Sequence, residues 1–147
     1  MSIIFEGVDG IGKTTNIRQF QLFNPGYVYI HNWAKATNRV DILSEASKEI
    51  LLLESNVPML FDRSYIVSEY VYAHVLGRDT PIDISYIEEW IKLIDRKEHT
   101  LKLFTFLNQS VLNIKPEDEN LPFAKLNETY RSLFVIHKPY QFILEEK

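Results

Sequence analysis

Short apolar runs recur along the chain, and longer stretches of mixed polarity separate them. Because these stretches are long enough to hold crossover helices, the pattern predicts βαβ units and therefore a parallel sheet. The first run, Ser2 to Phe5, is typical of a short buried strand. The expected strands cover residues 3–5, 27–30, 59–61, 101–107 and 141–144.

The segments between these runs have helical patterns. We expect helices over residues 13–23, 41–55, 64–76 and 123–137, with a further helix through the isoleucine stripe at positions 84, 87, 91 and 94. That stripe indicates core packing, with Ser85 and Glu88 as a candidate capping box and Asp83 as a competing cap. The apolar positions of the 41–55 helix include Val40, Leu43, Ile50 and Leu53.

The stretch FEGVDGIGKTT joins the first strand to the first helix and satisfies the pattern G-x-x-x-x-G-K-[ST] from Gly7 to Thr14. Glycines allow backbone N–H groups to curl around phosphate oxygens at the start of a helix. Lys13 adds a positive charge, and Thr14 adds a hydroxyl for Mg²⁺. The stretch therefore predicts a site for a nucleoside triphosphate rather than an ordinary glycine-rich turn.

Length and composition restrict the classes of protein. With 147 residues, we expect a single domain over 1–147, whose chemistry shares one cleft. The absence of cysteine excludes disulfides and thiolate metal sites, and the net charge of −4 makes nucleic acid an unlikely partner. There is neither a signal-peptide pattern nor an apolar run of membrane-spanning length, so we expect no membrane association and a cytoplasmic location.

A second motif ends the third expected strand, where Met59 to Phe61 lead into Asp62, Arg63 and Ser64. Strand ends on this side of a parallel sheet face the ligand. FEGVDGIGKTT together with FDRSY resembles the thymidylate kinase and deoxynucleoside kinase group of P-loop kinases. The resemblance implies an α/β fold of three α/β/α layers, with five parallel strands in the order 2-3-1-4-5. It also implies a short lid, which we place at about residues 108–121, the one polar, breaker-rich stretch.

The resemblance further implies roles for single residues. Asp62 matches the carboxylate that organises the Mg²⁺ and phosphate centre, Arg63 the arginine that grips the acceptor, and Asp9 the acid that contacts the acceptor sugar. Ser68 and Tyr72 match the helix that lines the base pocket. With ATP as donor and Mg²⁺ as cofactor, the expected nucleotide-binding residues are Gly7, Asp9, Gly10, Ile11, Gly12, Lys13, Thr14 and Thr15.

Charge neutralisation and exclusion of water dominate phosphoryl transfer, so the predicted catalytic residues are Lys13, Asp62 and Arg63, with Thr14 and Asp62 at the metal. Asp62 could hold the water shell of the metal or accept a hydroxyl proton. The alternative for Asp62 and Arg63 is a structural ion pair at a strand end.

The chain departs from the family in its cations. Relatives carry arginines in the phosphate loop or the lid, whereas the lid region here offers Lys115 and Lys125. Lysine can act as a point charge but lacks the forked geometry of guanidinium, so we expect either a slow enzyme or a transition-state cation from elsewhere, with Arg78 and Arg18 as candidates.

The acceptor region departs as well. The residues after the second strand are His31 to Lys35, in which Trp33 is a candidate for stacking on the acceptor base, or for ordinary core packing. Lys35 or Arg39 would then meet the acceptor phosphate. The four histidines show no paired metal spacing, which favours structural roles. Little chain follows the fifth strand, so we expect weak selectivity for the donor base.

The resulting expectation is a kinase that transfers the γ-phosphoryl group of ATP to a deoxynucleoside monophosphate, most directly dTMP. A deoxynucleoside kinase, a kinase of modified bases in DNA, and a nucleotide-binding module without catalysis are the alternatives. The short chain suggests a phage source, which would place the protein in the host cytoplasm, and the family habit suggests a homodimer.

Overall fold

The computed structural model describes residues 1–31 and 36–147. Within them, five parallel strands form one sheet in the order β2-β3-β1-β4-β5, as predicted. The strands are β1 (Ile3–Glu6), β2 (Val28–His31), β3 (Met59–Asp62), β4 (Thr100–Thr105) and β5 (Phe142–Glu146).

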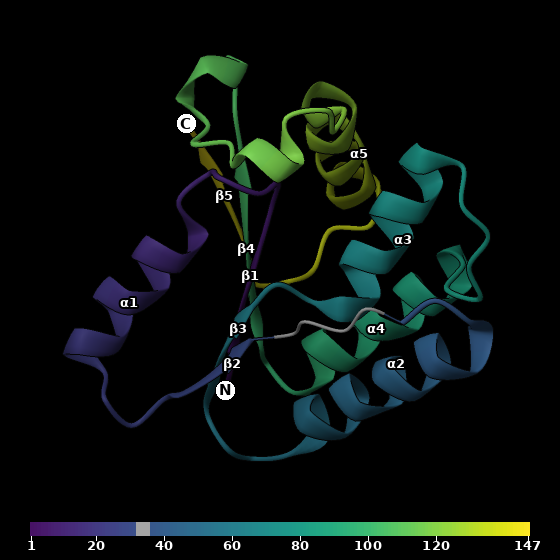
Figure 1. The fold of residues 1–147 in the computed structure, drawn as a ribbon. Coiled ribbons are helices and arrows are strands. Elements are labelled where there is room, and N and C mark those ends of the chain that lie inside the picture. Colours follow the sequence, from purple (N-terminus) through teal and green to yellow (C-terminus); the bar gives the residue numbers. More distant parts are fainter. Residues whose placement is uncertain (32–35) are drawn as a thin grey trace.

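Helices cover both faces of the sheet, which confirms the three-layer architecture (Figure 1). Helix α1 (Lys13–Phe23) lies on one face, and the other α-helices gather on the opposite face (Figure 1). These are α2 (Arg39–Glu54), α3 (Tyr65–Leu76), α4 (Ile84–Arg96) and α5 (Phe123–Ile136). Between β4 and α5 the chain makes two short 3₁₀ turns, η1 (Gln109–Val111) and η2 (Pro116–Asp118). No helix in the described ranges combines the length and apolar character that a bilayer crossing needs.

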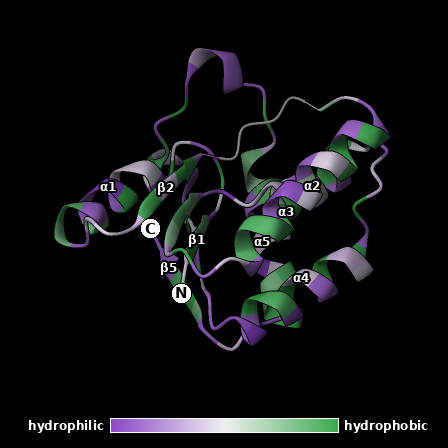
Figure 2. Cartoon of the chain, turned by 90° about the horizontal axis from the view of Figure 1, so that it is seen from below, coloured by the Kyte–Doolittle hydropathy of each residue, from purple (hydrophilic) through white to green (hydrophobic). Residues whose placement is uncertain are grey.

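The core lies where the central strands meet the larger helical layer. Every residue of β3 is buried, and Phe5, Leu103 and Phe104 of β1 and β4 are almost fully enclosed. The two-sided burial explains why these strands are continuous apolar runs. Seen from below, apolar residues in green and polar residues in purple interchange along the helices that flank the sheet (Figure 2).

Helix α4 confirms its predicted isoleucine stripe in part. Ile87 and Ile94 are fully buried, whereas Ile84 at the first turn is 38% exposed. The N-cap is Asp83, whose carboxylate accepts the backbone N–H of Tyr86 at 3.0 Å, so the Ser85 capping box is wrong.

The buried face of α2 matches the predicted apolar positions only in part. Val40 is 77% and Leu43 40% exposed, whereas Leu53 is buried and shares the face toward the core with Ile42, Ala46 and Glu49. A spacing of three and four residues puts these four on one side of the helix. The apolar positions misled the prediction because one member of the true face is a carboxylate.

That carboxylate, Glu49, joins three helices. Its oxygens accept hydrogen bonds from the Ser64 hydroxyl (2.6 Å), the Tyr65 backbone N–H (2.6 Å) and the Trp90 indole N–H (2.9 Å). Negative charge is favourable at the N-terminus of a helix, here that of α3. Burial nevertheless raises the pKa of Glu49 to about 7, while the three hydrogen bonds oppose that shift.

The raised pKa of Glu49 predicts how stability depends on pH. The folded state holds this proton more tightly than the unfolded state, so the contribution is complete below the ordinary value of 4.5 and is lost as the pH rises through about 7. In urea unfolding, the free energy of unfolding of the wild type should therefore fall relative to that of Glu49→Gln as the pH rises from 4.5 to about 7. Parallel pH profiles would contradict this, and Glu89→Gln on the exposed side of α4 controls for the loss of one charge.

Candidate functional site

The phosphate loop runs from β1 into α1 with the backbone its glycines allow. Gly7, Gly10 and Gly12 have φ values of 136°, 80° and 96°, in the left-handed region that favours glycine. Gly12 is the N-cap of α1 and makes no side-chain cap. The first N–H groups of α1 are therefore available to an anion at the helix N-terminus. Ile11 is buried beneath the loop, whereas Thr14 and Thr15 are exposed above it.

Lys13 lies inside this loop. Its Nζ donates to the carbonyl oxygens of Gly7 (3.0 Å) and Val8 (2.8 Å), and the side chain is buried. Burial, together with the charge of Arg63, lowers the pKa of Lys13 to about 7, although the carboxylates nearby oppose the shift. The lowered pKa means that the surrounding carboxylates do not fully compensate the buried ammonium. A further anion would stabilise it at this place, where the motif expects phosphate oxygens.

Asp62 and Thr14 meet at the mouth of the loop. The Thr14 hydroxyl donates to Oδ2 of Asp62 at 2.8 Å, which brings the ends of β3 and the phosphate loop together. A hydroxyl and a carboxylate beside phosphate oxygens are the ligands Mg²⁺ prefers, and it normally keeps several waters. The donor set therefore fits Mg²⁺ bound with a nucleotide. No group of three or more His, Cys, Asp or Glu in residues 1–31 and 36–147 could hold a metal alone.

Arg63 follows Asp62 and turns the chain with an unusual φ of 83°. Its Nη2 donates to Asp9 at 2.6 Å, and its Nη1 donates to the hydroxyls of Ser68 and Tyr130, each at 3.0 Å. The guanidinium side chain is only 13% exposed. Arg63 is thus a fixed positive charge at the edge of the loop.

Glu6 lies beneath this arginine, with a side chain that is fully enclosed and 3.7 Å from Nη1 of Arg63. It accepts hydrogen bonds from the backbone N–H groups of Gly7 and Ser64 and from the Ser68 hydroxyl. Burial raises its pKa, and the charges of Arg63 and Lys13 oppose the rise. Glu6 therefore ties the phosphate loop to the start of α3.

Two tyrosines complete the surroundings of Arg63. The ring centre of Tyr72 lies 5.6 Å from the guanidinium carbon, and its hydroxyl donates weakly to Asp9 at 3.4 Å. Tyr130 of α5 is fully buried and meets Tyr72 edge to face. Ser68 therefore fixes Arg63 through a hydrogen bond, and Tyr72 contacts both Arg63 and Asp9.

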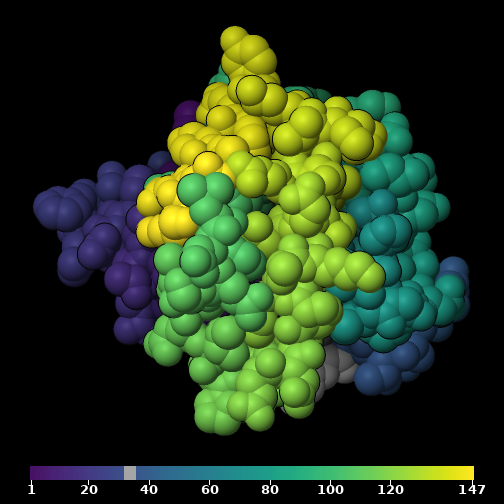
Figure 3. Space-filling model, turned by 90° about the horizontal axis from the view of Figure 1, so that it is seen from above, coloured from purple at the N-terminus to yellow at the C-terminus, as the bar shows by residue number. Residues whose placement is uncertain are grey.

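The segment between β4 and α5 reaches the phosphate loop. The Asn113 N–H donates to the Gly10 carbonyl oxygen at 2.9 Å, and a Cβ at Gly10 would lie 2.4 Å from the Asn113 carbonyl oxygen. Seen from above, this segment, in green, lies between the purple N-terminal part and the yellow-green α5 (Figure 3). The predicted lid segment therefore rests on the phosphate loop.

The phosphate loop, Asp62, Arg63 and the lid segment line one cavity of about 770 Å³, whereas Ser68 and Tyr72, predicted for the base pocket, do not line it. The phosphate loop forms one side, and Arg63 with Phe123 and the lid segment forms another. Its walls are Asp9, Gly10, Gly12, Lys13, Thr14, Thr15, His31, Asp62, Arg63, Asn113, Ile114, Lys115, Glu117, Asp118 and Phe123.

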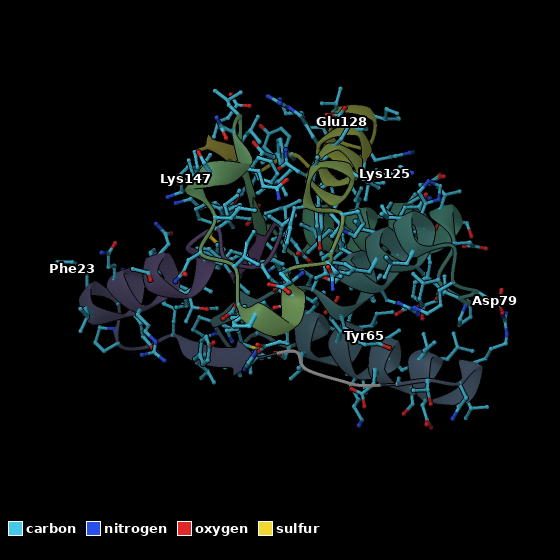
Figure 4. All side chains as sticks on the ribbon, turned by 45° about the horizontal axis from the view of Figure 1, so that its top comes forward. Phe23, Tyr65, Asp79, Lys125, Glu128 and Lys147 are labelled. Atoms are coloured by element: carbon cyan, nitrogen blue, oxygen red, sulfur yellow. The ribbon has the colours of Figure 1, made fainter. Side chains whose placement is uncertain are left out.

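Of the remaining residues predicted for the site, some line the cavity and others lie away from it. Lys115 lines the cavity, whereas Lys125 lies on the exposed side of α5 and is absent from the walls (Figure 4). Arg78 pairs with Glu69 at 2.9 Å, and neither it nor Arg18 lines the cavity. Arg39 pairs with Asp79 on the surface. Trp33 and Lys35 lie outside the described residues.

Sequence reasoning missed several groups. It assigned His31 a structural role, but His31 is exposed on the cavity wall at the end of β2. It also passed over Glu6, Tyr29 and Tyr130. Only Glu6 carried a signal, since an acid that closes a buried apolar run needs a partner.

No family model matches the chain, and no curated protein matches it. Solved structures do match. The YorR protein of Bacillus subtilis, solved in complex with phosphorylated GDP, superposes with a TM-score of 0.76 at 16% identity, over 99% of this chain and 85% of that one. Thymidylate kinase of Ehrlichia chaffeensis gives 0.61 at 15% identity, over 100% and 88% of the two chains. A gluconokinase of Sinorhizobium meliloti gives 0.58 at 14% identity, over 99% and 81%. At such identities the likeness is one of fold alone, that of a five-stranded parallel sheet between layers of helices.

The contact between Gly10 and Asn113 can be tested with alanine. Both Gly10→Ala and Gly77→Ala place a Cβ on a residue with left-handed backbone, which costs about 1–2 kcal/mol in each variant. Only at Gly10 does the new Cβ also clash with a neighbour, since a Cβ at Gly77 meets nothing within 4 Å. Gly10→Ala should also displace the lid segment and weaken ATP binding by about tenfold or more, or about 1.4 kcal/mol. Calorimetry that finds equal ATP affinity in the two variants would contradict this role for the contact.

The pKa of Lys13 predicts proton uptake on nucleotide binding. Phosphate oxygens beside Nζ favour the ammonium form, so binding should raise a pKa that lies at about 7 without them. At about pH 8 the binding enthalpy of ATP should depend on the ionisation enthalpy of the buffer, and at about pH 6 that dependence should nearly vanish. The same buffer dependence at both pH values would contradict the assignment.

Proposed function

We propose that this protein is a Mg²⁺-dependent kinase that transfers the γ-phosphoryl group of ATP to a deoxynucleoside monophosphate, most directly dTMP. The observation that carries the proposal is the shared cavity. It joins a phosphate loop and the Thr14–Asp62 pair to Arg63 and Asp9, with room for both substrates. A donor and an acceptor held side by side meet the main requirement of phosphoryl transfer.

On the donor side, the backbone N–H groups of the loop and the start of α1 bind the phosphates. Lys13 would exchange its carbonyl partners for phosphate oxygens, and Thr14 and Asp62 would hold Mg²⁺ directly or through water. When bound, Mg²⁺ would supply neutralisation of the phosphate charge. The lid segment over the loop excludes water, and Lys115 brings a cation to the cavity wall.

On the acceptor side, Arg63 would grip the acceptor phosphate, and Asp9 would accept a hydrogen bond from a sugar hydroxyl. Phe123 closes the cavity wall, but its side chain is almost fully buried, so it offers little surface for stacking of the base. An acceptor phosphate must share the guanidinium with Asp9, Ser68 and Tyr130. Because Arg63 is already fixed by these contacts, it would lose little side-chain entropy on binding.

One observation favours a second candidate, a kinase of an uncharged nucleoside hydroxyl. The hydrogen bonds of Arg63 to Asp9, Ser68 and Tyr130 need not be broken for a neutral acceptor. Asp62 would then accept the hydroxyl proton. A kinase of modified bases in DNA has less support, since net acidity opposes a nucleic acid partner.

Two further parts of the proposal rest on the sequence alone. We place the protein in the cytoplasm, that of the host if it is phage-encoded, and we propose a homodimer from the family resemblance. A nucleotide-binding module without catalysis is the alternative of another class, which the missing loop arginine favours.

The direct test is ADP release from Mg-ATP with a panel of deoxynucleosides and their monophosphates. Turnover that depends on one acceptor and vanishes in Lys13→Ala would establish the kinase and its acceptor class. ATP binding without turnover on any acceptor would favour the binding module.

The role of Arg63 predicts a selective kinetic defect. Arg63→Ala should raise the KM for a monophosphate acceptor by more than about 1.5 kcal/mol equivalent, roughly tenfold, and leave ATP affinity nearly unchanged, since charge-assisted bonds are lost. Arg96→Ala, which removes an exposed arginine paired with Glu54 away from the cavity, serves as the control. An unchanged acceptor constant in Arg63→Ala would remove the phosphate-gripping role.

A further inference from the structure

Tyr29 makes a short contact with the residue at the centre of the site. Its hydroxyl donates to Oδ2 of Asp62 at 2.6 Å, and the Thr14 hydroxyl donates to the same oxygen at 2.8 Å. Two hydroxyl donors thus converge on one carboxylate oxygen. In the described part of the chain, Oδ1 of Asp62 accepts no hydrogen bond, so one of its two oxygens is held and the other is left to other ligands.

The strand register explains the contact. Tyr29 pairs with Leu60 and His31 pairs with Asp62 across the parallel β2–β3 ladder. Residues two apart on a strand share a face, so Tyr29 and Asp62 lie on the same side of the sheet, two positions apart. The phenol ring is long enough to span that offset, whereas a shorter side chain at position 29 would not reach the carboxylate.

Tyr29 does not itself line the cavity, whereas Asp62 and Thr14 do. Burial and the neighbouring carboxylate raise the pKa of Tyr29 to about 12, so the phenol keeps its proton and remains a donor at neutral pH. An O–H donor that is fixed in this way favours the ionised carboxylate and one orientation of it.

We propose that Tyr29 is a positioning residue, which holds Asp62 by Oδ2 so that Oδ1 is presented to the Mg²⁺ of a bound Mg-nucleotide. The inference deepens the proposed function at one point only, since it needs Asp62 to serve a metal–nucleotide centre but not to support turnover. Partners that orient metal ligands from outside the first coordination shell typically change metal affinity or activity by about 10- to 100-fold.

The test separates the metal from the nucleotide by calorimetry. ATP affinity is measured with Mg²⁺ and with EDTA, and the ratio of the two is the Mg²⁺ enhancement. Tyr29→Phe should reduce this enhancement about tenfold and leave the affinity in EDTA unchanged. Tyr27→Phe is the matched control, because Tyr27 lies two residues before Tyr29, packs edge to face on Phe20 and makes no hydrogen bond to Asp62.

A double-mutant cycle shows whether Tyr29 acts through Asp62. Asp62→Ala should abolish most of the enhancement, and adding Tyr29→Phe to it should cause no further loss. A merely structural role for the tyrosine would give additive effects, together with lower affinity in EDTA.

The outcomes also separate the inference from the proposed function. An equal Mg²⁺ enhancement in wild type and Tyr29→Phe would overturn the inference, even in an active kinase. Selective loss in Tyr29→Phe would support it, even if no acceptor is turned over. A wild type whose ATP affinity ignores Mg²⁺ would overturn it as well.

Discussion

The parallel pairing of β1 with β3 is the constraint on which the site depends. Phe5 and Asp62 are register partners, and the Arg63 N–H extends the ladder to the Phe5 carbonyl oxygen at 2.9 Å. The strand that leads into the phosphate loop therefore ends beside the strand that carries the acid and the arginine. The positive φ of Arg63, strained by about 1–2 kcal/mol, then turns its guanidinium over the loop.

Buried carboxylates keep this geometry in place. Glu6 binds the first amide of the loop, the start of α3 and the Ser68 hydroxyl, while Glu49 holds the same helix from α2. Each carboxylate loses hydration on burial, and each recovers part of that loss through converging donors. In return for this desolvation the two carboxylates fix the orientation of α3, because the helix cannot rotate without breaking its hydrogen bonds to both acids. The phosphoryl transfer that we propose would need that rigidity, since it depends on position and charge rather than covalent chemistry.

Much of the fold follows from patterns that the sequence displays. The five apolar runs became five parallel strands, the strand order is the one that the family resemblance implied, and the phosphate loop lies where its motif placed it. The apolar positions of α2 predicted its buried face only in part, because Glu49 belongs to that face and composition cannot show that a carboxylate has buried donors. The sequence patterns did not indicate a role for Tyr29 or Tyr130 for a related reason. Their hydroxyls reach Asp62 and Arg63 across sequence separations of 33 and 67 residues, and only the sheet order and helix packing bring them together.

The central claim is that one cavity holds donor and acceptor at once, and a bisubstrate compound tests it most directly. Calorimetry would compare ATP with a molecule that joins adenosine and thymidine through a polyphosphate bridge, both with Mg²⁺. The account predicts binding of the joined molecule at least about 100-fold tighter than that of ATP, because one association then makes both sets of contacts. Equal affinity would mean that only the nucleotide half binds, which would contradict the shared site.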